Sequence, residues 1–357
     1  MTTQQLPLFR NTNSIRRSGM STRRFIHVVI VTSLVFSQNS VRAADRTTIQ
    51  KSAEKALALL QQCGPEFYRQ SGCVACHQQG VTSIAVGAAR SRGFHVDEDT
   101  AAHQVQITLL TIKSYQDTFR QRIYHPMASS TASGFIMLGL AAEETPQDRY
   151  TDANTIEMAN LQREDGSWTA FGHRPPSEYS QVAATALGIR ALQLYGPPAK
   201  REEFERRIEN ARHWLIDRQP TVNTDYVFRL LGLSWSGSEQ QLIDDAVVAL
   251  VAQQQNDGGW SQRETMESDA YATGLTLYAL YHAGQFAGDN PVYAKGVDFL
   301  LESQLEDGSW HVQTRTFPFQ KHFESGFPHG KDQWISASAT GFAATALINS
   351  LPPVKIE

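Results

Sequence analysis

The chain alternates between two kinds of apolar segment, and both have the spacing of a helix. Segments of the first kind carry small or apolar residues on every face. Four of them align position for position, beginning at Ser133, Thr185, Thr273 and Thr340, and Phe228–Leu233 is a shorter fifth copy. A helix without a polar face is buried on all sides, and small side chains let helix backbones approach closely. The five segments are therefore predicted to be inner helices.

Segments of the second kind are amphipathic and end in a glutamine, which favours a position on the outside. Three copies continue from the glutamine through an Asp-Gly turn to a tryptophan, and they run over Met158–Trp168, Leu250–Trp260 and Leu300–Trp310. A fourth, Trp214–Gln219, keeps only the helical half. The glycine is suited to a positive φ at the helix end. The glutamine amide can satisfy free backbone groups there, and the tryptophans are predicted to be packing residues.

This Gln–Trp pattern resembles the QW motif of the prenyltransferase and squalene oxidase repeat family, which includes squalene–hopene cyclase. The resemblance covers roughly residues 130–350 and implies an α/α toroid. The inner segments recur about every fifty residues, and one step back falls within Val81–Ala89. With Thr48–Tyr68 and Asp97–Tyr115 as partners, the chain has six inner and six outer helices. We predict an all-α toroid of about six helical hairpins.

Residues 1–43 are predicted to be a targeting segment. Arg23-Arg24 precede the apolar run Phe25–Phe36, which is too short to span a bilayer, and Val41–Ala43 offers small residues for cleavage. We expect an extracytoplasmic, periplasmic protein with no transmembrane anchor after cleavage. Residues 44–120 are predicted to form the first hairpin or hairpins, and residues 121–357 the repeat toroid, packed with them as one domain.

Loss of the targeting segment changes the charge of the chain. The segment contains six arginines and no acidic residue, so the formal net charge of −4 becomes about −10. An acidic surface argues against nucleic acid or anionic lipid as a partner. We expect the partner to be a redox protein or a small apolar ligand.

Cys73, Cys76 and His77 form a Cys-x-x-Cys-His run, the attachment signature of c-type haem. Two thiols at this spacing reach the two vinyl groups of one porphyrin, and the histidine reaches the iron. The alternatives are a redox dithiol or half of a zinc site, but the chain offers neither a βαβ context nor a second Cys/His pair. We predict covalent haem c with His77 as an iron ligand. The third cysteine, Cys63, is expected to be a core residue.

In a toroid of hairpins the inner helices run parallel, so their N-termini meet at one mouth. The haem motif precedes the first inner helix and is expected there, together with Met127, Glu178, Asp225, Asp269 and Asp332. The long connection Val312–Trp334 is also expected there, and a loop of this length is usually functional. His329 in this loop is our first choice for the second axial ligand, and Met127 is the alternative. An open iron site is the third outcome.

These observations favour an exported monohaem c-type cytochrome on a squalene-cyclase-like toroid. It would act in electron transfer or in redox chemistry on a small apolar molecule, as an oxidoreductase if the haem is catalytic. The alternative is a terpenoid cyclase-like enzyme or a ligand-binding toroid without haem. Squalene–hopene-type cyclases protonate their substrate with an Asp-x-Asp-Asp motif, which this chain lacks. The isolated Asp269 is a candidate acid, although it also fits the role of a helix cap.

Overall fold

The computed structural model describes residues 45–123, 129–170, 172–318 and 321–353, without the side chains of Cys76 and His77. In these ranges the regular structure is helical and contains no strand. The predicted targeting segment, residues 1–43, lies outside the described residues, and so do His125 and Met127. The targeting segment and the exported location therefore stay predictions. None of the described helices combines the length and the apolar character of a membrane span.

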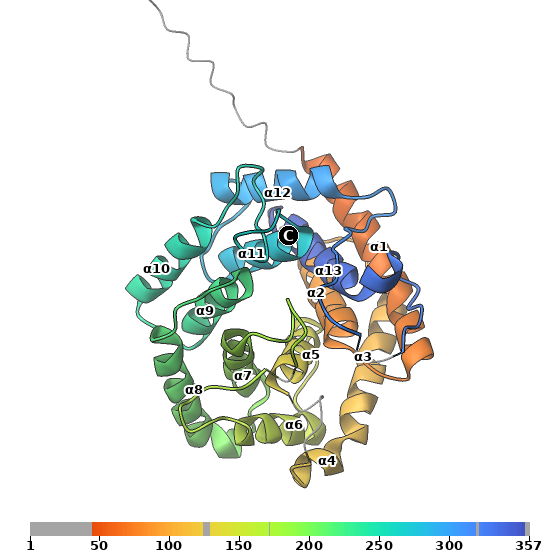
Figure 1. The fold of residues 1–357 in the computed structure, drawn as a ribbon. Coiled ribbons are helices and arrows are strands. Elements are labelled where there is room, and N and C mark those ends of the chain that lie inside the picture. Colours follow the sequence, from red (N-terminus) through yellow and green to blue (C-terminus); the bar gives the residue numbers. More distant parts are fainter. Residues whose placement is uncertain (1–44, 124–128, 171, 319–320, 354–357) are drawn as a thin grey trace, which may run out of the picture. The chain divides into compact units, whose positions relative to one another are not determined.

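Residues 45–353 form a ring of helices in two layers (Figure 1). The inner layer consists of α2 (Val81–Ser91), α5 (Ser130–Ala142), α7 (Gln181–Tyr195), α9 (Asn223–Trp235), α11 (Ala270–His282) and α13 (Gln333–Asn349). The outer layer consists of α1 (Arg46–Ser71), α3 (Glu98–Ser114), α6 (Arg149–Asn160), α8 (Arg201–Ile216), α10 (Gln240–Val251) and α12 (Pro291–Ser303), with the short α4 (Gln116–Arg120) after α3. Each inner helix contacts the next, and α13 returns to contact α2. The predicted toroid, with its assignment of inner and outer helices, is confirmed.

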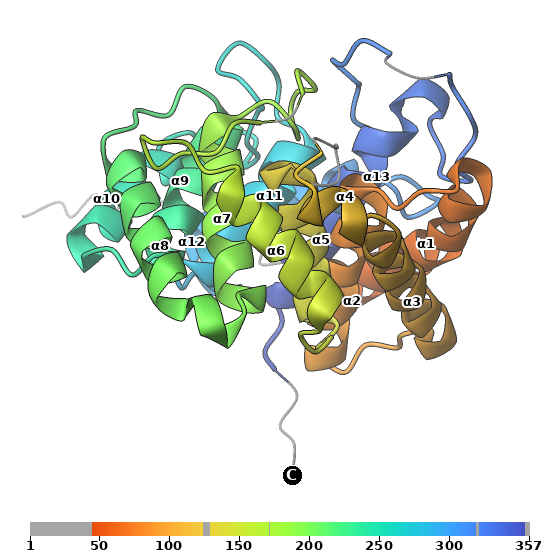
Figure 2. The same ribbon diagram turned by 90° about the horizontal axis from the view of Figure 1, so that it is seen from below.

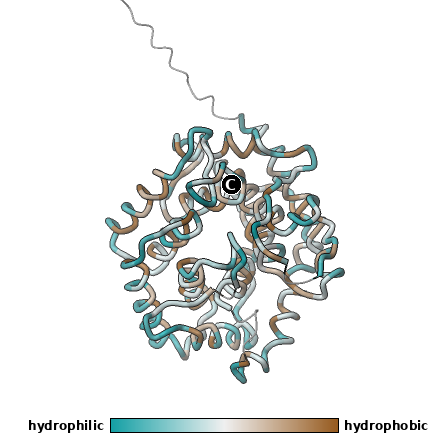
Figure 3. Tube along the Cα trace, viewed as in Figure 1, coloured by the Kyte–Doolittle hydropathy of each residue, from teal (hydrophilic) through white to brown (hydrophobic). Residues whose placement is uncertain are grey.

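The two layers differ in burial as their sequences predict. Every residue of α11 from Ala270 to Leu280 is buried, whereas only Phe204, Ala211, Trp214 and Leu215 are buried in the outer α8. Hydrophilic stretches gather in the loops and the outer helices (Figure 3). Small residues bring the inner backbones together, because a Cβ at Gly274 would lie 2.6 Å from the backbone nitrogen of Ala343. The glycine is thus required by the packing of α11 against α13.

The repeat glutamines join neighbouring outer helices. Gln162 Nε2 donates to the carbonyl of Gly166 in its own turn (2.9 Å) and to that of Arg207 in α8 (2.8 Å). Gln254 makes the same two bonds, to Gly258 and to Val292 in α12. The turn glycines have φ values of 87–88°, as predicted. The amide therefore joins the turn after its own helix to the next outer helix.

The third glutamine closes the ring between its last and first outer helices. Gln304 Nε2 donates to the carbonyl of Ser52 in α1 (3.0 Å), and Ser52 Oγ donates to Gln304 Oε1 (2.6 Å). The same amide nitrogen donates to the carbonyl of Gly308 (3.0 Å). Residues 252 positions apart are thus held side by side at the seam between α12 and α1 (Figure 1).

The repeat tryptophans are packing residues, as predicted. Trp168, Trp260 and Trp310 are all buried. Each indole nitrogen donates to a carbonyl ten residues earlier, at distances of 2.6–3.0 Å. Each tryptophan backbone N–H donates to the threonine hydroxyl of the following inner helix, in the first case that of Thr185. The tryptophan therefore fixes the inner helix against the outer helix before it.

We predict that Gln304→Leu lowers the free energy of unfolding by about 1–3 kcal/mol, because it removes the acceptor of the buried Ser52 hydroxyl and the donor to the carbonyls of Ser52 and Gly308. Urea unfolding followed by circular dichroism measures this loss. Gln253→Leu, at an exposed glutamine, is the matched control, expected to change stability by no more than about 0.5 kcal/mol. Equal stability of the two variants would contradict a role for Gln304 in closing the ring.

Candidate functional site

The connections that lead into the inner helices gather on one side of the ring (Figure 2). We call this side the N-terminal mouth; it includes residues 174–180, 221–225, 260–269, 312–318 and 321–332. The acidic residues expected here lie just before or within the first turn of their helices. Glu178 forms an ion pair with Arg174, Asp225 accepts from Ser180 Oγ (2.5 Å), and Asp332 accepts from the Thr314 backbone N–H (2.8 Å). These three carboxylates therefore have partners within the connections that hold them.

Asp269 is the N-cap of α11, as predicted, and its Oδ1 accepts the backbone N–H of Ala272 (2.9 Å). Its own backbone N–H donates to the carbonyl of Trp260 (3.0 Å), which ties the cap to the repeat tryptophan. Burial raises the pKa of Asp269 from 3.8 to about 6, against the lowering effects of the helix N–H groups, Gln262 and Arg315. At neutral pH the carboxyl thus retains a protonated fraction, while its surroundings stabilise the carboxylate left by proton release.

Arg315 reaches the same place from the long connection between α12 and α13. Its Nε donates to Gln262 Oε1 (2.7 Å), and the carbonyl of Gln262 accepts the backbone N–H of Asn223. Burial lowers the pKa of Arg315, and its Nη2 is buried without a hydrogen-bond partner among the described residues. Neither residue was predicted from the sequence, because the residues around Gln262 and Arg315 give no sign that the two side chains, 53 positions apart, are in contact.

Aromatic rings fill the ring interior, beginning two residues after Asp269. Tyr271 meets Phe342 edge to face (5.8 Å between centroids), and Phe342 also meets Tyr278 (6.0 Å) and Phe135 (6.2 Å). Phe135 in turn meets Phe228 (5.9 Å). We call these five residues the aromatic cluster. It draws on α5, α9, α11 and α13, and such π faces attract positive charge.

The Cys-x-x-Cys-His segment lies between α1 and α2. Cys73 Sγ donates to the carbonyl of Val74 (3.3 Å), and burial raises the pKa of this thiol. Cys76–Gly80 forms a π-helical turn that contacts α5 and α13. Gln78, Gln79 and Gly80 are buried, and a Cβ at Gly80 would lie 2.9 Å from the carbonyl oxygen of Phe135. The residues after the motif are therefore committed to the packing of the ring.

The structure gives His329 a partner of its own. Its Nε2 lies 2.7 Å from Ser309 Oγ, and Ser309 donates to Asp307 (2.6 Å). Its ring packs against that of His311, 4.9 Å between centroids, and its φ of 81° is left-handed. His329 thus ties the long connection to the last Gln–Trp turn. Cys63, expected in the core, is buried; burial raises its pKa to about 11, and its thiol donates to the carbonyl of Gly326 (3.1 Å).

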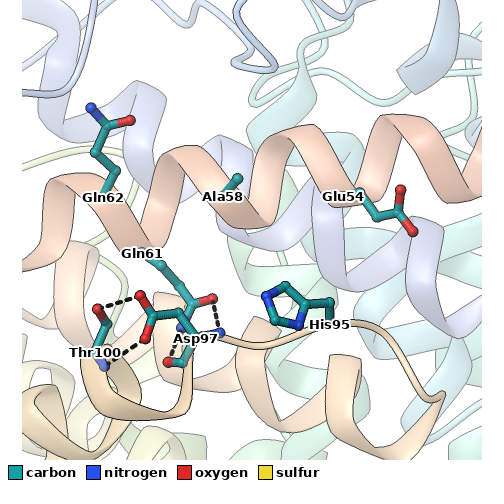
Figure 4. A pocket seen from close by; sticks show the side chains of 7 residues that line it. All are labelled: Glu54, Ala58, Gln61, Gln62, His95, Asp97 and Thr100. Carbon is teal, nitrogen blue, oxygen red and sulfur yellow. Dashed lines mark hydrogen bonds between the residues drawn. The ribbon is translucent and has the colours of Figure 1, made fainter.

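A pocket of about 670 Å³ lies away from this mouth, between α1 and the start of α3 (Figure 4). Its polar groups bond to one another. Gln61 donates to the carbonyl of Asp97 (2.9 Å) and accepts its backbone N–H (3.0 Å), while Asp97 Oδ1 accepts the backbone N–H of Thr100 (3.0 Å). These bonds brace α1 against α3, so we assign the pocket a structural role.

No protein-family model matches the chain. Its curated relatives are terpene cyclases. It is 29% identical over 184 residues to drimenyl diphosphate synthase of Streptomyces showdoensis, covering 48% of this chain and 33% of the relative. It is 24% identical over 247 residues to squalene–hopene cyclase of Bradyrhizobium diazoefficiens, covering 57% and 36%. The chain thus spans about a third of the length of these relatives.

Solved structures match over more of their length. Type II terpene cyclase MstE from Scytonema, in complex with its product merosterolic acid A, has a TM-score of 0.55 at 15% identity, covering 85% of this chain and 97% of that one. MstE in complex with its substrate, geranylgeranyl dihydroxybenzoate, gives 0.54. The chain has the squalene-cyclase-like fold of the terpene cyclases.

The predictions of covalent haem c and of a c-type cytochrome are wrong. The proteins that are similar to this chain in sequence or in fold carry the names of terpene cyclases. Among the described residues no group of three or more His, Cys, Asp and Glu is placed to hold a metal ion. The spacing of Cys73, Cys76 and His77 suits a porphyrin, but it is weak evidence for haem when the residues after it are packed inside the ring. The roles of His77, His329 and Met127 as iron ligands, and of Cys73 and Cys76 as thioether anchors, lose their basis with the haem.

We predict that Asp269 makes the stability of the fold depend on pH. Its pKa is about 6 in the folded chain and near 3.8 when exposed. The stabilisation is therefore fully present below pH 3.8 and is lost as the pH rises through about 6. Asp269→Asn keeps a capping side chain without the charge. Between about pH 4.5 and about pH 8, the wild type should lose about 1–3 kcal/mol relative to this variant in urea unfolding.

The matched control is Asp45→Asn, at the exposed N-cap of α1. Hydrogen bonds from Thr47 and Thr48 lower the pKa of Asp45, so its stabilisation is lost only at acidic pH. Asp45→Asn should therefore show no such divergence from the wild type above about pH 5. Parallel behaviour of Asp269→Asn and the wild type across this range would contradict the raised pKa.

Proposed function

We propose that this chain is a terpene-cyclase-like enzyme that protonates an apolar isoprenoid at the N-terminal mouth, with Asp269 as the proton donor. The observation that carries the proposal is the position of this carboxyl. It lies on the N-terminus of an inner helix, two residues before the aromatic cluster, and burial raises its pKa to about 6. The names of the curated relatives and the fold shared with MstE support the same class of reaction.

The groups around Asp269 suit an acid that must give up its proton to carbon. Desolvation raises the pKa, so that a fraction of the carboxyl is protonated near neutral pH when the substrate binds. The N–H groups at the start of α11, the Gln262 side chain and the charge of Arg315 then stabilise the carboxylate. Desolvation raises the pKa, whereas the hydrogen-bond donors and the charge lower it. The first effect allows part of the carboxyl to be protonated before the reaction, and the second helps it to release the proton.

The proposed reaction needs no cofactor or external oxidant. The O–H bond of Asp269 breaks as its proton forms a C–H bond with the terminal alkene, and the π electrons of that alkene supply the bonding pair. The next alkene attacks the resulting cation and closes a ring. The last cation loses a proton to water or adds water, and solvent reprotonates Asp269. The π faces of Tyr271, Phe342 and Phe135 lie where they can stabilise positive charge near the mouth.

We expect squalene or geranylgeraniol incubated with the full chain to yield cyclic isomers or hydrates, detected by gas chromatography with mass spectrometry. Asp269→Asn should lower the rate by about 10²–10⁴-fold, the usual contribution of a general acid, while it still binds the substrate. The wild-type rate should rise as the pH falls through about 6, since the protonated carboxyl is the active form.

Asp45→Asn is again the matched control, because it alters an N-cap on an outer helix and should keep the wild-type rate. Cyclisation by Asp269→Asn at the wild-type rate would exclude Asp269 as the acid. Binding of both isoprenoids without turnover would replace the proposal by a ligand-binding toroid. Absence of both binding and turnover would refute a terpenoid function for these substrates.

A further inference from the structure

A second pocket lies at the other side of the ring, where the inner helices end. It has a volume of about 270 Å³ and is lined by residues of α2, α5, α11 and α13. Ile84 and Leu138 contribute apolar walls, and Tyr278, His282 and Asn349 contribute polar groups. We call it the C-terminal pocket. It takes no part in the proposed chemistry of Asp269, which caps the opposite end of α11.

Asn349 is the residue that points to a ligand. Its side chain lines the pocket and is 5% exposed, yet its Nδ2 has no hydrogen-bond partner among the described residues. A buried amide N–H group without a partner is costly and is usually satisfied by water or by a bound molecule. A molecule in this pocket that presents an acceptor oxygen would satisfy it.

The other polar groups of the pocket are electrically neutral. The rings of Tyr278 and His282 pack together with 4.3 Å between centroids. Burial raises the pKa of Tyr278 to about 12 and lowers that of His282 to about 4, so near neutral pH the first is a phenol and the second an uncharged imidazole. The pocket thus offers O–H and N–H groups but no charged side chain in its lining.

Four inner helices end around these donors, and several of their last carbonyls accept backbone N–H groups of the turns that follow, for example Leu140 from Thr145 and Leu280 from Phe286. The last carbonyl groups of a helix have no partner within it and form the negative end of its dipole. This negative end disfavours an anion in the pocket. Arg190, whose charge also lowers the pKa of His282, packs over Trp235 at 5.5 Å and is absent from the lining.

We propose that the C-terminal pocket binds a small neutral alcohol or phenol with an apolar body. The hydroxyl oxygen accepts from Asn349 Nδ2, and the hydroxyl proton is donated to the neutral imidazole of His282. The apolar body packs against Ile84 and Leu138. This site is independent of the proposed cyclase activity, and its occupancy is measurable without turnover.

The test uses three fluorinated probes of similar size and one readout, ¹⁹F NMR line broadening with the full chain. 4-Fluorophenol has the hydroxyl, 4-fluorotoluene lacks it, and 4-fluorobenzoate is an anion. We expect the phenol to bind at least about fivefold more tightly than the other two, the effect of one net hydrogen bond. Equal or tighter binding of the toluene or the benzoate would overturn the proposal.

Two variants locate the binding. Asn349→Leu has nearly the same volume and removes the unpartnered N–H, so it should weaken phenol binding by about fivefold or more. Ala88→Leu, at a partly buried lining position, should fill the pocket and abolish binding even where Asn349→Leu destabilises the fold. Asn210→Leu, at an exposed position of α8, is the control and should bind like the wild type. Unchanged phenol affinity in Ala88→Leu would refute the site.

Discussion

The whole fold depends on one side-chain amide that recurs in every complete repeat. A helix that ends inside a packed protein leaves its last carbonyls without partners, and the repeat glutamine supplies a donor for a turn carbonyl and for a carbonyl of the next outer helix. One such hydrogen bond contributes only about 1 kcal/mol. The same turn, however, places the tryptophan whose N–H groups fix the following inner helix. At the three places where it occurs, a single local motif thereby holds an outer helix, the following inner helix and the next outer helix together.

The position of the candidate acid is a product of this arrangement. Because the inner helices run in one direction, their N-termini and the connections before them meet on one side, where Asp269 can be both capped and largely withdrawn from solvent. Capping favours the carboxylate, and burial favours the protonated acid. In the folded ring the effect of burial is the larger one, and the pKa of Asp269 is about 6. The other carboxylates at this mouth have partners of their own: Glu178 has Arg174, and Asp225 has Ser180.

The features that could be predicted are those that repeat. Small residues on every face marked the inner helices, and the spacing from Gln162 to Trp168, with two further copies, marked the turns; both are local consequences of close packing. Asp269 was recognisable as a cap because a cap bonds only to the next few residues. The contact between Gln262 and Arg315 was not predictable, since it joins two irregular connections whose paths no pattern records.

The haem prediction failed for a related reason. It treated a five-residue spacing as if it were as informative as a structural repeat. Such a spacing determines which groups could reach a porphyrin, but it does not determine whether the surrounding fold leaves room for one. The burial of Gln78, Gln79 and Gly80 against the ring is a tertiary property. His329 was likewise predicted to be an iron ligand because of its position in the long loop, whereas in the fold its imidazole lies within hydrogen-bond distance of Ser309.

The seam between α12 and α1 distinguishes this ring from an open array of repeats. In a linear solenoid the terminal units lack one neighbour and need a polar capping surface. Here the bonds between Gln304 and Ser52 give the last hairpin the first as its neighbour. Arg46 begins α1, the first described helix, and Pro352 follows α13, the last one. Both residues line one pocket. A chain joined between these two helices and opened at another loop would therefore still place Gln304 beside Ser52.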